Sequence, residues 1–290
     1  MMIDLHSHIL PGIDDGAGDL ETAIAMARAS VADGVAVLAC TPHILPGLFH
    51  NSGPNIRIAV ENLQEELRSR DIPLKLVTGA DNHVIPDFVA GLRRGHLLSL
   101  ADSRYVLVEP PHHTAPPRLG DLLFSIMTAG YIPIVTHPER LTWIETHYEL
   151  MKELAARGVW MQITAGALTG AFGRAPKYWG ERMLCEGLVH ILATDTHDMT
   201  SRPPVLSKGY ACAARLVGDE EAQRLVHGRP LAILENQAPA SVVGPIAVSR
   251  EGSRIHVARR VHPKPLARAR SGRDHRGGSG VIEWVQRLFS

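Results

Sequence analysis

Short apolar runs alternate with longer amphipathic stretches along most of this chain. Seven of these runs are four to seven residues long and rich in Val, Ile and Leu, as buried strands are. They lie at residues 2–5, 35–40, 74–78, 105–108, 132–135, 159–163 and 189–193. Strands that are apolar nearly throughout are buried on both faces, so the pattern predicts a parallel sheet covered by helices.

Amphipathic patterns typical of helices fill most of the intervals between the runs. We expect helices at residues 20–32, 55–70, 118–129, 146–157, 178–186, 204–216 and 220–226. Glycines follow four of these patterns, at Gly34, Gly130, Gly158 and Gly187, where a helix commonly ends in the left-handed conformation. The chain is therefore predicted to be an α/β protein of repeated strand and helix units.

Nine residues able to bind metals stand at or just after the ends of the predicted strands. They are His6, His8, Asp15, His43, Asp81, Glu109, His137, Asp195 and His197. A doubly wound open sheet gathers its site mainly near one switch point, whereas these residues follow the first five strands and the seventh. Ligands from so many strands meet when the strands form a closed ring with one mouth, so we expect a barrel.

Two pairs of these residues support a shared metal site most strongly. His6 and His8 leave the first strand two residues apart, and Asp195 and His197 do the same at the last strand. Side chains two apart on a strand share a side, which suits the binding of one cation. Asp15 lies in a turn that brings another carboxylate toward the same mouth.

The nine residues combine imidazoles and carboxylates without a thiolate. This donor set suits Mn, Fe or Zn in a reactive site better than a closed structural zinc site. Nine ligands exceed what one ion needs, so we expect two or three divalent ions, with Mn as the first choice. Such a centre holds phosphoryl oxygens and generates a hydroxide nucleophile near neutral pH. The sequence thus predicts a polynuclear metallohydrolase.

Two arginines extend the prediction to a phosphoester substrate. Arg140 and Arg202 each lie a few residues beyond a predicted ligand, and a guanidinium offers phosphate a planar fork of donors. We expect both to bind substrate and, with Asp195, to act in catalysis. Glu139 is expected to pair with a neighbouring arginine.

Other residues near the predicted mouth have open roles. His112 and His113, in the loop after Glu109, are candidates for substrate contact or proton donation, with a solvated loop as the plainer interpretation. The three cysteines, Cys40, Cys185 and Cys212, have no arginine six positions later, so none fits a cysteine phosphatase loop. We expect them to fill the core.

Composition and charge limit the class of protein. The chain has 290 residues, of which 45% are hydrophobic, enough for one large core. From residue 236 onward there are ten Lys and Arg against three Asp and Glu, which leaves 20 against 27 before it. An acidic body argues against a nucleic-acid partner. The N-terminal residues lack the pattern of a signal peptide, so we expect a cytoplasmic protein.

Seven motifs, in order along the chain, resemble the polymerase and histidinol phosphatase (PHP) superfamily. Within it, the chain is most similar to the CpsB/CapC-type tyrosine phosphatases of bacterial capsule and exopolysaccharide synthesis. The resemblance covers residues 2–235 and implies a distorted (β/α)7 TIM-like barrel, the PHP fold. The motifs are Met-Ile-Asp-Leu-His-Ser-His, Asp-Asp-Gly, Thr-Pro-His, Gly-Ala-Asp, Asp-Ser-Arg-Tyr-Val-Leu-Val-Glu, Thr-His-Pro-Glu-Arg, and Thr-Asp-Thr-His followed by Ser-Arg-Pro-Pro.

The resemblance also implies how the ligands divide among the ions. It gives one ion to His6, His8, Asp81 and Asp195, a second to Asp81, Glu109 and His137, and a third to Asp15, His43 and His197. The family's better-known members have glutamate where this chain has Asp81, which is shorter by one methylene. His83, two residues on, is an alternative ligand.

The implied activity is hydrolysis of phosphotyrosine by a hydroxide held at the metal centre. The implied partner is the tyrosine-rich tail of a membrane-bound polysaccharide kinase or co-polymerase. A histidinol-phosphate or other small-molecule phosphatase would share the same ligands, and a catalytically weak scaffold of the assembly machinery is a third alternative. An amidohydrolase typically bridges its metals through a carboxylated lysine at the end of the fourth strand, and it is disfavoured because none of the five lysines lies there.

Residues 1–235 are predicted to form the metallophosphatase barrel and residues 236–290 a basic extension. In the extension we expect a short hairpin from 246–248 and 254–258, an Arg- and Gly-rich disordered stretch from 264 to 280, and a terminal amphipathic helix. A basic run before such a helix is able to contact anionic lipids at the inner face of the membrane. The oligomeric state is left open.

Overall fold

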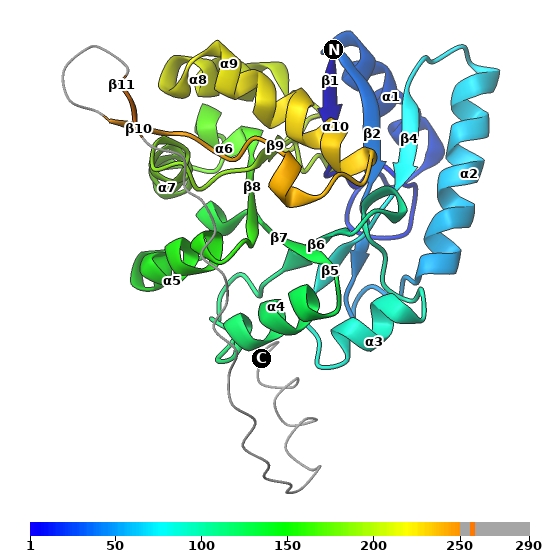
Figure 1. Ribbon diagram of the computed structural model, residues 1–290. Helices are drawn as coiled ribbons and strands as arrows, with labels where there is room; N and C mark the ends of the chain where they lie inside the picture. The colour runs from blue at the N-terminus through cyan, green and yellow to red at the C-terminus, as the bar shows by residue number, and fades with distance from the viewer. Residues whose placement is uncertain (250–255, 259–290) are drawn as a thin grey trace, which may run out of the picture.

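The computed structural model describes residues 1–249 and 256–258. Its main strands form two parallel sheets, and Figure 1 shows the helices arranged around them. The three-stranded sheet has the order β1-β2-β4 and contains β1 (Met2–Asp4), β2 (Val35–Cys40) and β4 (Lys75–Thr78). The six-stranded sheet has the order β3-β5-β6-β7-β8-β9 and contains β3 (His43–Ile44), β5 (Asp81–His83), β6 (Tyr105–Glu109), β7 (Ile132–Thr136), β8 (Trp160–Thr164) and β9 (Ile191–Ala193).

All seven predicted strands are present, and two short strands are additional. Two residues separate the end of β2 from the start of β3, and two separate the end of β4 from the start of β5. Pro42 in the first gap has no backbone N–H to donate, which explains one interruption of the ladder. The apolar pattern did not reveal β3 and β5 because four of their five residues are polar.

The expected closed barrel is only partly supported. Hydrogen bonding within the described residues forms two parallel sheets instead of one continuous ring. The ends of β1 and β9 do approach each other through a parallel bridge between Ser7 and Thr196, with His8 N donating to Thr196 O at 2.9 Å. The structure therefore shows a mixed α/β fold with parallel sheets.

The two sheets share an interior apolar cluster. Tyr105 and Leu107 of β6 pack there with Ile3 of β1 and Ile134 of β7, while the alternate β6 residue Val106 packs in the outer core beneath the helices. Side chains alternate between the faces of a strand, so β6 contributes to both layers. The strands are thus buried on both faces, as their apolar pattern predicted.

Ten α-helices are found in the described residues, together with short 3-10 and π turns. Their bounds are α1 (Leu20–Ala32), α2 (Gly53–Ser69), α3 (Phe88–Arg93), α4 (Leu119–Thr128), α5 (Ile144–Ala156), α6 (Ala165–Thr169), α7 (Arg174–Cys185), α8 (Ser207–Val217), α9 (Asp219–Gln223) and α10 (Arg229–Leu234). All seven predicted helices correspond to one of these. The three that were missed, α3, α6 and α10, have five or six residues, too few for a helical periodicity to show.

The predicted glycine positions have the expected backbone conformation. Gly34, Gly130, Gly158 and Gly187 have φ values of 93°, 93°, 99° and 71°. The predicted helix at 220–226 differs in detail. There α9 ends at Gln223, and a π turn, η3 (Arg224–Gly228), continues the chain into α10. Residues 220–226 are helical throughout, so the helix was predicted correctly, but the change from α9 to a π turn after Gln223 was not predicted.

The chain beyond residue 235 continues to contact the strands and helices before it. Tyr105 Oη donates to Gln237 O at 2.9 Å, and the buried Arg229 donates to Val243 O and Gly244 O, each at 2.9 Å. Further on, β10 (Ala247–Ser249) pairs antiparallel with β11 (His256–Ala258), where the sequence suggested a hairpin.

The rest of the predicted extension cannot be compared with the structure. The Arg- and Gly-rich stretch and the terminal amphipathic helix lie outside the described residues. Among the described helices, none is both long and apolar enough to cross a membrane.

Candidate metal centre

The nine predicted ligands converge at one end of the strands. His6 and His8 follow β1, Glu109 ends β6, and Asp195 and His197 follow β9. Eight of the nine are buried, and Asp15 has a half-exposed side chain. The parallel strands therefore carry polar residues from distant parts of the sequence to one buried place, as predicted.

The first group is built on the His-x-His pair. His6 Nε2 lies 3.4 Å from Asp81 Oδ2 and 3.4 Å from Asp195 Oδ1, and His8 Nε2 lies 3.4 Å from the same Asp195 oxygen. The two Nε2 atoms are 3.2 Å apart. The chain after β1 places both rings on one side. Potential ligand atoms of His6, His8 and Asp81 lie within 4.8 Å of one another, as do those of His6, His137 and Asp195.

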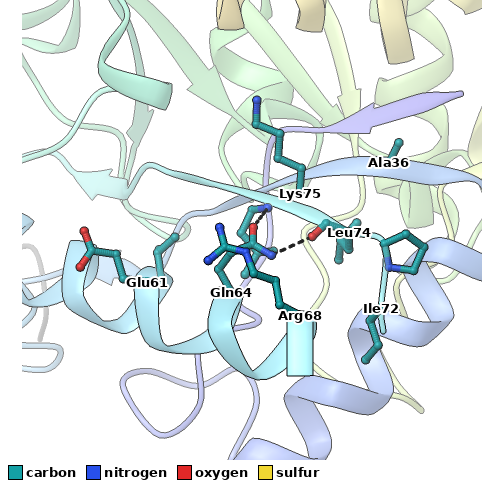
Figure 2. Close-up of a pocket in the computed structure, with 10 residues that line it drawn as sticks. Ala36, Glu61, Gln64, Arg68, Ile72, Leu74 and Lys75 are labelled. Carbon is teal, nitrogen blue, oxygen red and sulfur yellow. Dashed lines mark hydrogen bonds between the residues drawn. The ribbon is translucent and has the colours of Figure 1, made fainter. Parts of the chain in front are cut away.

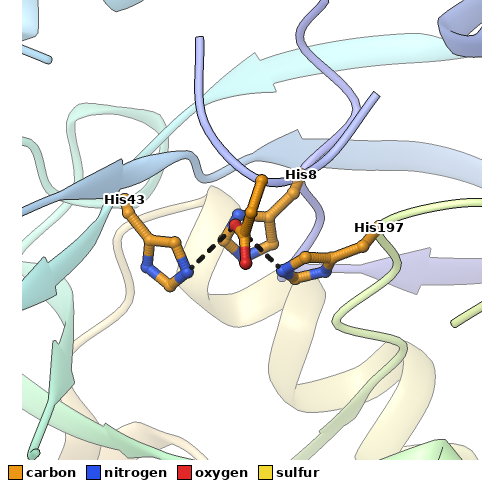
Figure 3. Close-up of side chains that lie close together, drawn as sticks. His8, His43 and His197 are labelled. Atoms are coloured by element: carbon orange, nitrogen blue, oxygen red, sulfur yellow. Dashed lines mark ion pairs between the residues drawn. The ribbon is translucent and has the colours of Figure 1, made fainter. Parts of the chain in front are cut away.

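A second group lies beside it and shares His8. His43 Nε2 is 3.5 Å and His197 Nε2 is 3.4 Å from Asp15 Oδ1. Figure 3 shows the rings of His8, His43 and His197 directed toward one carboxylate. Potential ligand atoms of all four residues lie within 4.8 Å of one another.

Glu109 is the centre of the third group. Its Oε2 atom lies 3.0 Å from His43 Nδ1, and its Oε1 atom lies 3.5 Å from His137 Nε2. His83, suggested by the sequence as an alternative ligand, also reaches Glu109, and His112 Nε2 is 3.7 Å from Oε1.

Several of these buried polar atoms have no hydrogen-bond partner within the described residues. Both Asp81 oxygens are in this state, as are His43 Nδ1, Glu109 Oε2 and His197 Nε2. Burying an unpaired carboxylate is costly, and a bound cation removes that cost. The nitrogen and oxygen donors present therefore fit a site for divalent metal ions.

Burial and charge in the cluster favour the ligand form of Asp195 and His137 but the protonated form of His6. Burial alone would raise the pKa of Asp195, but His6 and Arg202 hold it well below its usual range. Burial would lower the pKa of His6, but Asp195 and Asp81 raise it to about 9. Burial lowers the pKa of His137 to about 4. Protons and metal ions would compete for His6, since only the neutral imidazole is a ligand.

Two of the predicted ligands occupy a backbone conformation that is uncommon for their residue type. His137 has φ 34° and Asp195 has φ 53°, both in the left-handed region. Non-glycine residues adopt this region at a cost and are often found there at functional sites. Each lies directly after or close to a strand end, where the turn directs its side chain into the cluster.

Supporting residues that the sequence did not identify hold the ligand rings. Gln162 Oε1 lies 2.9 Å from His6 Nδ1, and Asp14 Oδ2 lies 2.7 Å from His8 Nδ1. Asp14 also accepts from the backbone N–H of His43 at 3.1 Å. Such partners fix which ring nitrogen faces the metal. Asp14 stands next to the predicted ligand Asp15, a signal that was available, whereas nothing local marks Gln162.

The two predicted phosphate-binding arginines meet at one ligand. Arg140 Nη1 and Arg202 Nη2 both contact Asp195 Oδ2, while Asp195 Oδ1 faces His6 and His8. The Arg140 guanidinium also lies over the Phe172 ring, 4.4 Å from its centroid. The arginines are therefore held beside the ligand cluster through one carboxylate.

Three other predicted residues have different surroundings. Glu139 forms no salt bridge with an arginine of the described residues, although the charge of Arg140 acts to lower its pKa. Its Oε1 accepts from the backbone N–H of Thr164 at 2.8 Å, and burial raises its pKa to about 7. His112 is half-buried with its ring 4.9 Å from that of His137. His113 is exposed, 6.3 Å from the His112 ring, so of this pair only His112 contacts the cluster.

Comparison with known proteins places this site in a family. The family described as capsular polysaccharide synthesis, CpsB/CapC, matches residues 2–235. The chain belongs to the CpsB/CapC family. The resemblance that the sequence motifs suggested is thereby confirmed.

Individual CpsB/CapC relatives match most of the chain. The tyrosine-protein phosphatase YwqE of Bacillus subtilis (strain 168) is 37% identical over 201 residues, covering 69% of this chain and 79% of the relative. The tyrosine-protein phosphatase CpsB of Streptococcus pneumoniae is 30% identical over 248 residues, covering 81% and 99%.

A solved structure agrees with these matches. It comes from work on B. subtilis YwqE and S. pneumoniae CpsB, described as unique metal-dependent tyrosine phosphatases. The two folds superpose with a TM-score of 0.79 at 34% identity, covering 82% of this chain and 96% of the other.

Two cavities of this CpsB/CapC protein lie away from the ligand cluster. One, of about 630 Å³, lies between α2 and the start of β4, where Figure 2 shows Gln64 bonded to the backbone beside Arg68 and Lys75. The other, of about 670 Å³, lies between α3 and α4 and includes Phe124. Neither cavity contains a predicted ligand, so the candidate site rests on the polar cluster.

Proposed function

We propose that this chain is a metal-dependent phosphatase that hydrolyses phosphotyrosine in proteins. The observation that carries the proposal is the double contact of Asp195, whose Oδ1 faces two histidine ligands while its Oδ2 contacts both arginines. A phosphoryl group bound to the arginines would therefore lie next to the metal ligands. The named activities of YwqE and CpsB support the same function.

In this proposal the protein's own residues bind and orient the phosphate. Arg140 and Arg202 each have guanidinium donors besides those directed at Asp195, and these are suited to phosphoryl oxygens. Phe172 packs against Arg140 and limits its movement. Bound divalent ions would supply a hydroxide nucleophile near neutral pH and neutralise charge on the phosphoryl oxygens.

An aryl phosphate is the easier substrate for such a site. A phenol leaves with a pKa of about 10, whereas water and aliphatic alcohols are on the order of 15, so a tyrosine leaving group needs little help from a general acid. His112 is the half-buried histidine at the rim that is available for substrate contact. A thiolate mechanism is disfavoured at Cys40, since burial raises the pKa of this thiol.

The finer features of the proposal follow the resemblance. They are two or three ions divided among the nine ligands as described above, with Mn as the first choice. If β2 and β3 count as one interrupted strand and β4 and β5 as another, the two sheets contain seven strands. The Ser7–Thr196 bridge between the ends of β1 and β9 would then close them into a distorted barrel. The substrate would be the phosphotyrosine tail of a membrane-bound polysaccharide kinase or co-polymerase, reached from the cytoplasm, and residues 236–290 would form the basic extension.

Substrate comparison tests this function. The full-length protein is assayed with a phosphotyrosine peptide, a phosphoserine peptide and histidinol phosphate, first after EDTA treatment and then with added Mn²⁺. We expect Mn²⁺-dependent turnover, fastest on the phosphotyrosine peptide. His8→Ala and Asp195→Ala should each lose about 100-fold or more, since each removes a ligand whose ion stabilises charge by several kcal/mol.

The matched control is His96→Ala, an exposed histidine in the turn after α3, which should keep full turnover. Faster hydrolysis of histidinol phosphate would favour the small-molecule phosphatase instead. Metal binding without turnover of any of the three substrates would favour the scaffold.

A further inference from the structure

β5 directs two polar side chains to the ligand cluster and one away from it. Asp81 and His83 share one face because side chains alternate along a strand. Between them, the fully buried Asn82 uses its amide nitrogen to donate to Leu98 O at 2.9 Å and Leu107 O at 3.1 Å. These bonds hold Asn82 against the backbone and thereby fix the direction of its two neighbours.

The register of the sheet brings His83 beside a ligand. Across β3 and β5, His43 is the partner of Asp81, and across β5 and β6, His83 is the partner of Glu109. Partners on adjacent parallel strands point to the same face. The strands therefore place an imidazole and a carboxylate side by side twice in succession, and the second pair contains His83.

The atoms of this second pair converge without forming a satisfied hydrogen bond. His83 Nε2 lies 2.5 Å and His43 Nδ1 lies 3.0 Å from Glu109 Oε2. Even so, Glu109 Oε2 and His43 Nδ1 lack a hydrogen-bond partner of acceptable geometry within the described residues, and His83 is buried. Atoms that approach one point without being aligned with one another are arranged as the ligands of a cation are.

The neighbouring carboxylate of Asp81 does not extend as far toward this point. Its Oδ2 atom lies 3.7 Å from His43 Nδ1 and 3.8 Å from His137 Nε2. A glutamate at position 81 would carry its oxygens one methylene further into the cluster. With the shorter Asp81 at its position, it is the His83 ring of β5 that reaches Glu109 Oε2.

We infer that His83 is a further metal ligand, which acts with Glu109 at a point that His43 Nδ1 also faces and compensates for the short reach of Asp81. The inference rests on the metal centre of the proposed function and adds a ligand that the nine predicted residues do not include. The three side chains place potential ligand atoms within 4.8 Å of one another. Two imidazoles and a carboxylate suit Mn, Fe or Zn.

A simpler role for His83 is an ion pair with Glu109 that contributes only to folding. The two roles differ in what the removal of His83 does to metal binding. A ligand contributes directly to the affinity for one ion. A pairing partner of Glu109 instead competes with metal, so its loss would leave the affinity unchanged or increase it.

Metal titration of the full-length protein separates these roles without using a substrate. The wild type, His83→Ala, Asp81→Glu and the double variant are stripped of metal and titrated with Mn²⁺ by calorimetry, and the bound metal is counted by mass spectrometry. We expect His83→Ala to lose one bound ion or to bind it at least tenfold more weakly. Asp81→Glu should restore most of that binding in the double variant.

Two controls make the result interpretable. His190→Gln replaces a buried histidine outside the cluster, whose ring stacks on Trp160, and should bind Mn²⁺ as the wild type does. His83→Gln keeps a polar side chain of similar length and provides a second test if His83→Ala does not fold, as judged by circular dichroism in EDTA.

Unchanged Mn²⁺ count and affinity in the folded His83 variant would overturn the inference. A loss of binding that Asp81→Glu does not restore would overturn the compensation between the two residues. The readout is metal binding, so a protein that binds metal through His83 but does not hydrolyse phosphotyrosine would contradict the proposed function alone.

Discussion

Gln162 orients the imidazole ring of His6, the first predicted ligand along the chain. Its Oε1 atom lies 2.9 Å from His6 Nδ1, so it accepts from the Nδ1–H tautomer and leaves Nε2 to face the metal ions. We predict that Gln162→Leu lowers Mn²⁺ affinity about 10- to 100-fold, the usual effect of losing such a partner. Calorimetric titration of the metal-free protein measures this change.

Gln162→Glu is the matched variant. It keeps an acceptor for His6 Nδ1, so it should bind Mn²⁺ at least as tightly as the wild type, whereas Gln162→Leu should bind it more weakly. A leucine variant that folds and titrates like the wild type would show that His6 is oriented without Gln162.

The residues of the site divide by whether a local pattern marks them. His6 and His8 were predictable because their spacing of two places both on one side of a strand end. Gln162 was not, because its role depends on β8 lying where its side chain meets His6, and no feature near position 162 states this. The same holds for Glu139, whose bond to Thr164 N depends on how β8 follows η2 (Pro138–Arg140) in space.

Among the strands of the two parallel sheets, those with apolar runs were predicted and those formed mainly by polar residues were not. α1 has the bounds that its pattern gave, and the Asp19 side chain accepts from Thr22 N at its start. β3 and β5 were missed because they consist mainly of ligand residues and their neighbours. Function overrides the local pattern in these two strands, so the pattern is least informative where the chemistry lies.

The turn after α7 offers a test of how its helix end meets the later chain. Gly187 has φ 71°, and a Cβ there would lie 2.6 Å from Ala247 N. Gly130 after α4 has φ 93° with nothing within 4 Å of a Cβ. We predict that Gly130→Ala costs about 1–2 kcal/mol for the left-handed backbone alone. Gly187→Ala should cost about 1–3 kcal/mol more because of the added clash.

Urea unfolding measures the free energy of unfolding of both variants and the wild type. EDTA in the buffer removes any effect of bound metal. Equal losses for Gly187→Ala and Gly130→Ala would mean that the backbone at Ala247 does not pack on Gly187 in solution. The difference between the variants, more than either value, reports the contact.

For the whole molecule, the boundary of the folded body lies beyond residue 235 in the described structure. Arg229 is 1% exposed and pairs with Glu221 at 2.6 Å, and its other donors are taken by Val243 O, Gly244 O and His190 O. The family match ends at residue 235. A boundary placed at residue 235 therefore separates Arg229 from the carbonyl groups of Val243 and Gly244, which accept its hydrogen bonds.

Two truncations follow from this arrangement. A chain ending at residue 249 loses the pairing of β10 with β11 but keeps the acceptors of Arg229. It should therefore unfold at nearly the same urea concentration as the full-length protein and bind Mn²⁺ equally well. A chain ending at residue 235 loses Val243 O, Gly244 O and the Gln237 O that binds Tyr105 Oη. Each buried donor left unpaired costs about 1–3 kcal/mol, so this chain should lose several kcal/mol of unfolding free energy or fail to fold. Equal stability of the two truncations would place residues 236–249 outside the cooperative unit.

Co-sedimentation with anionic lipid vesicles compares the full-length protein with the chain ending at residue 249. The removal of residues 250–290 should abolish vesicle binding if that basic segment attaches the enzyme to a membrane surface.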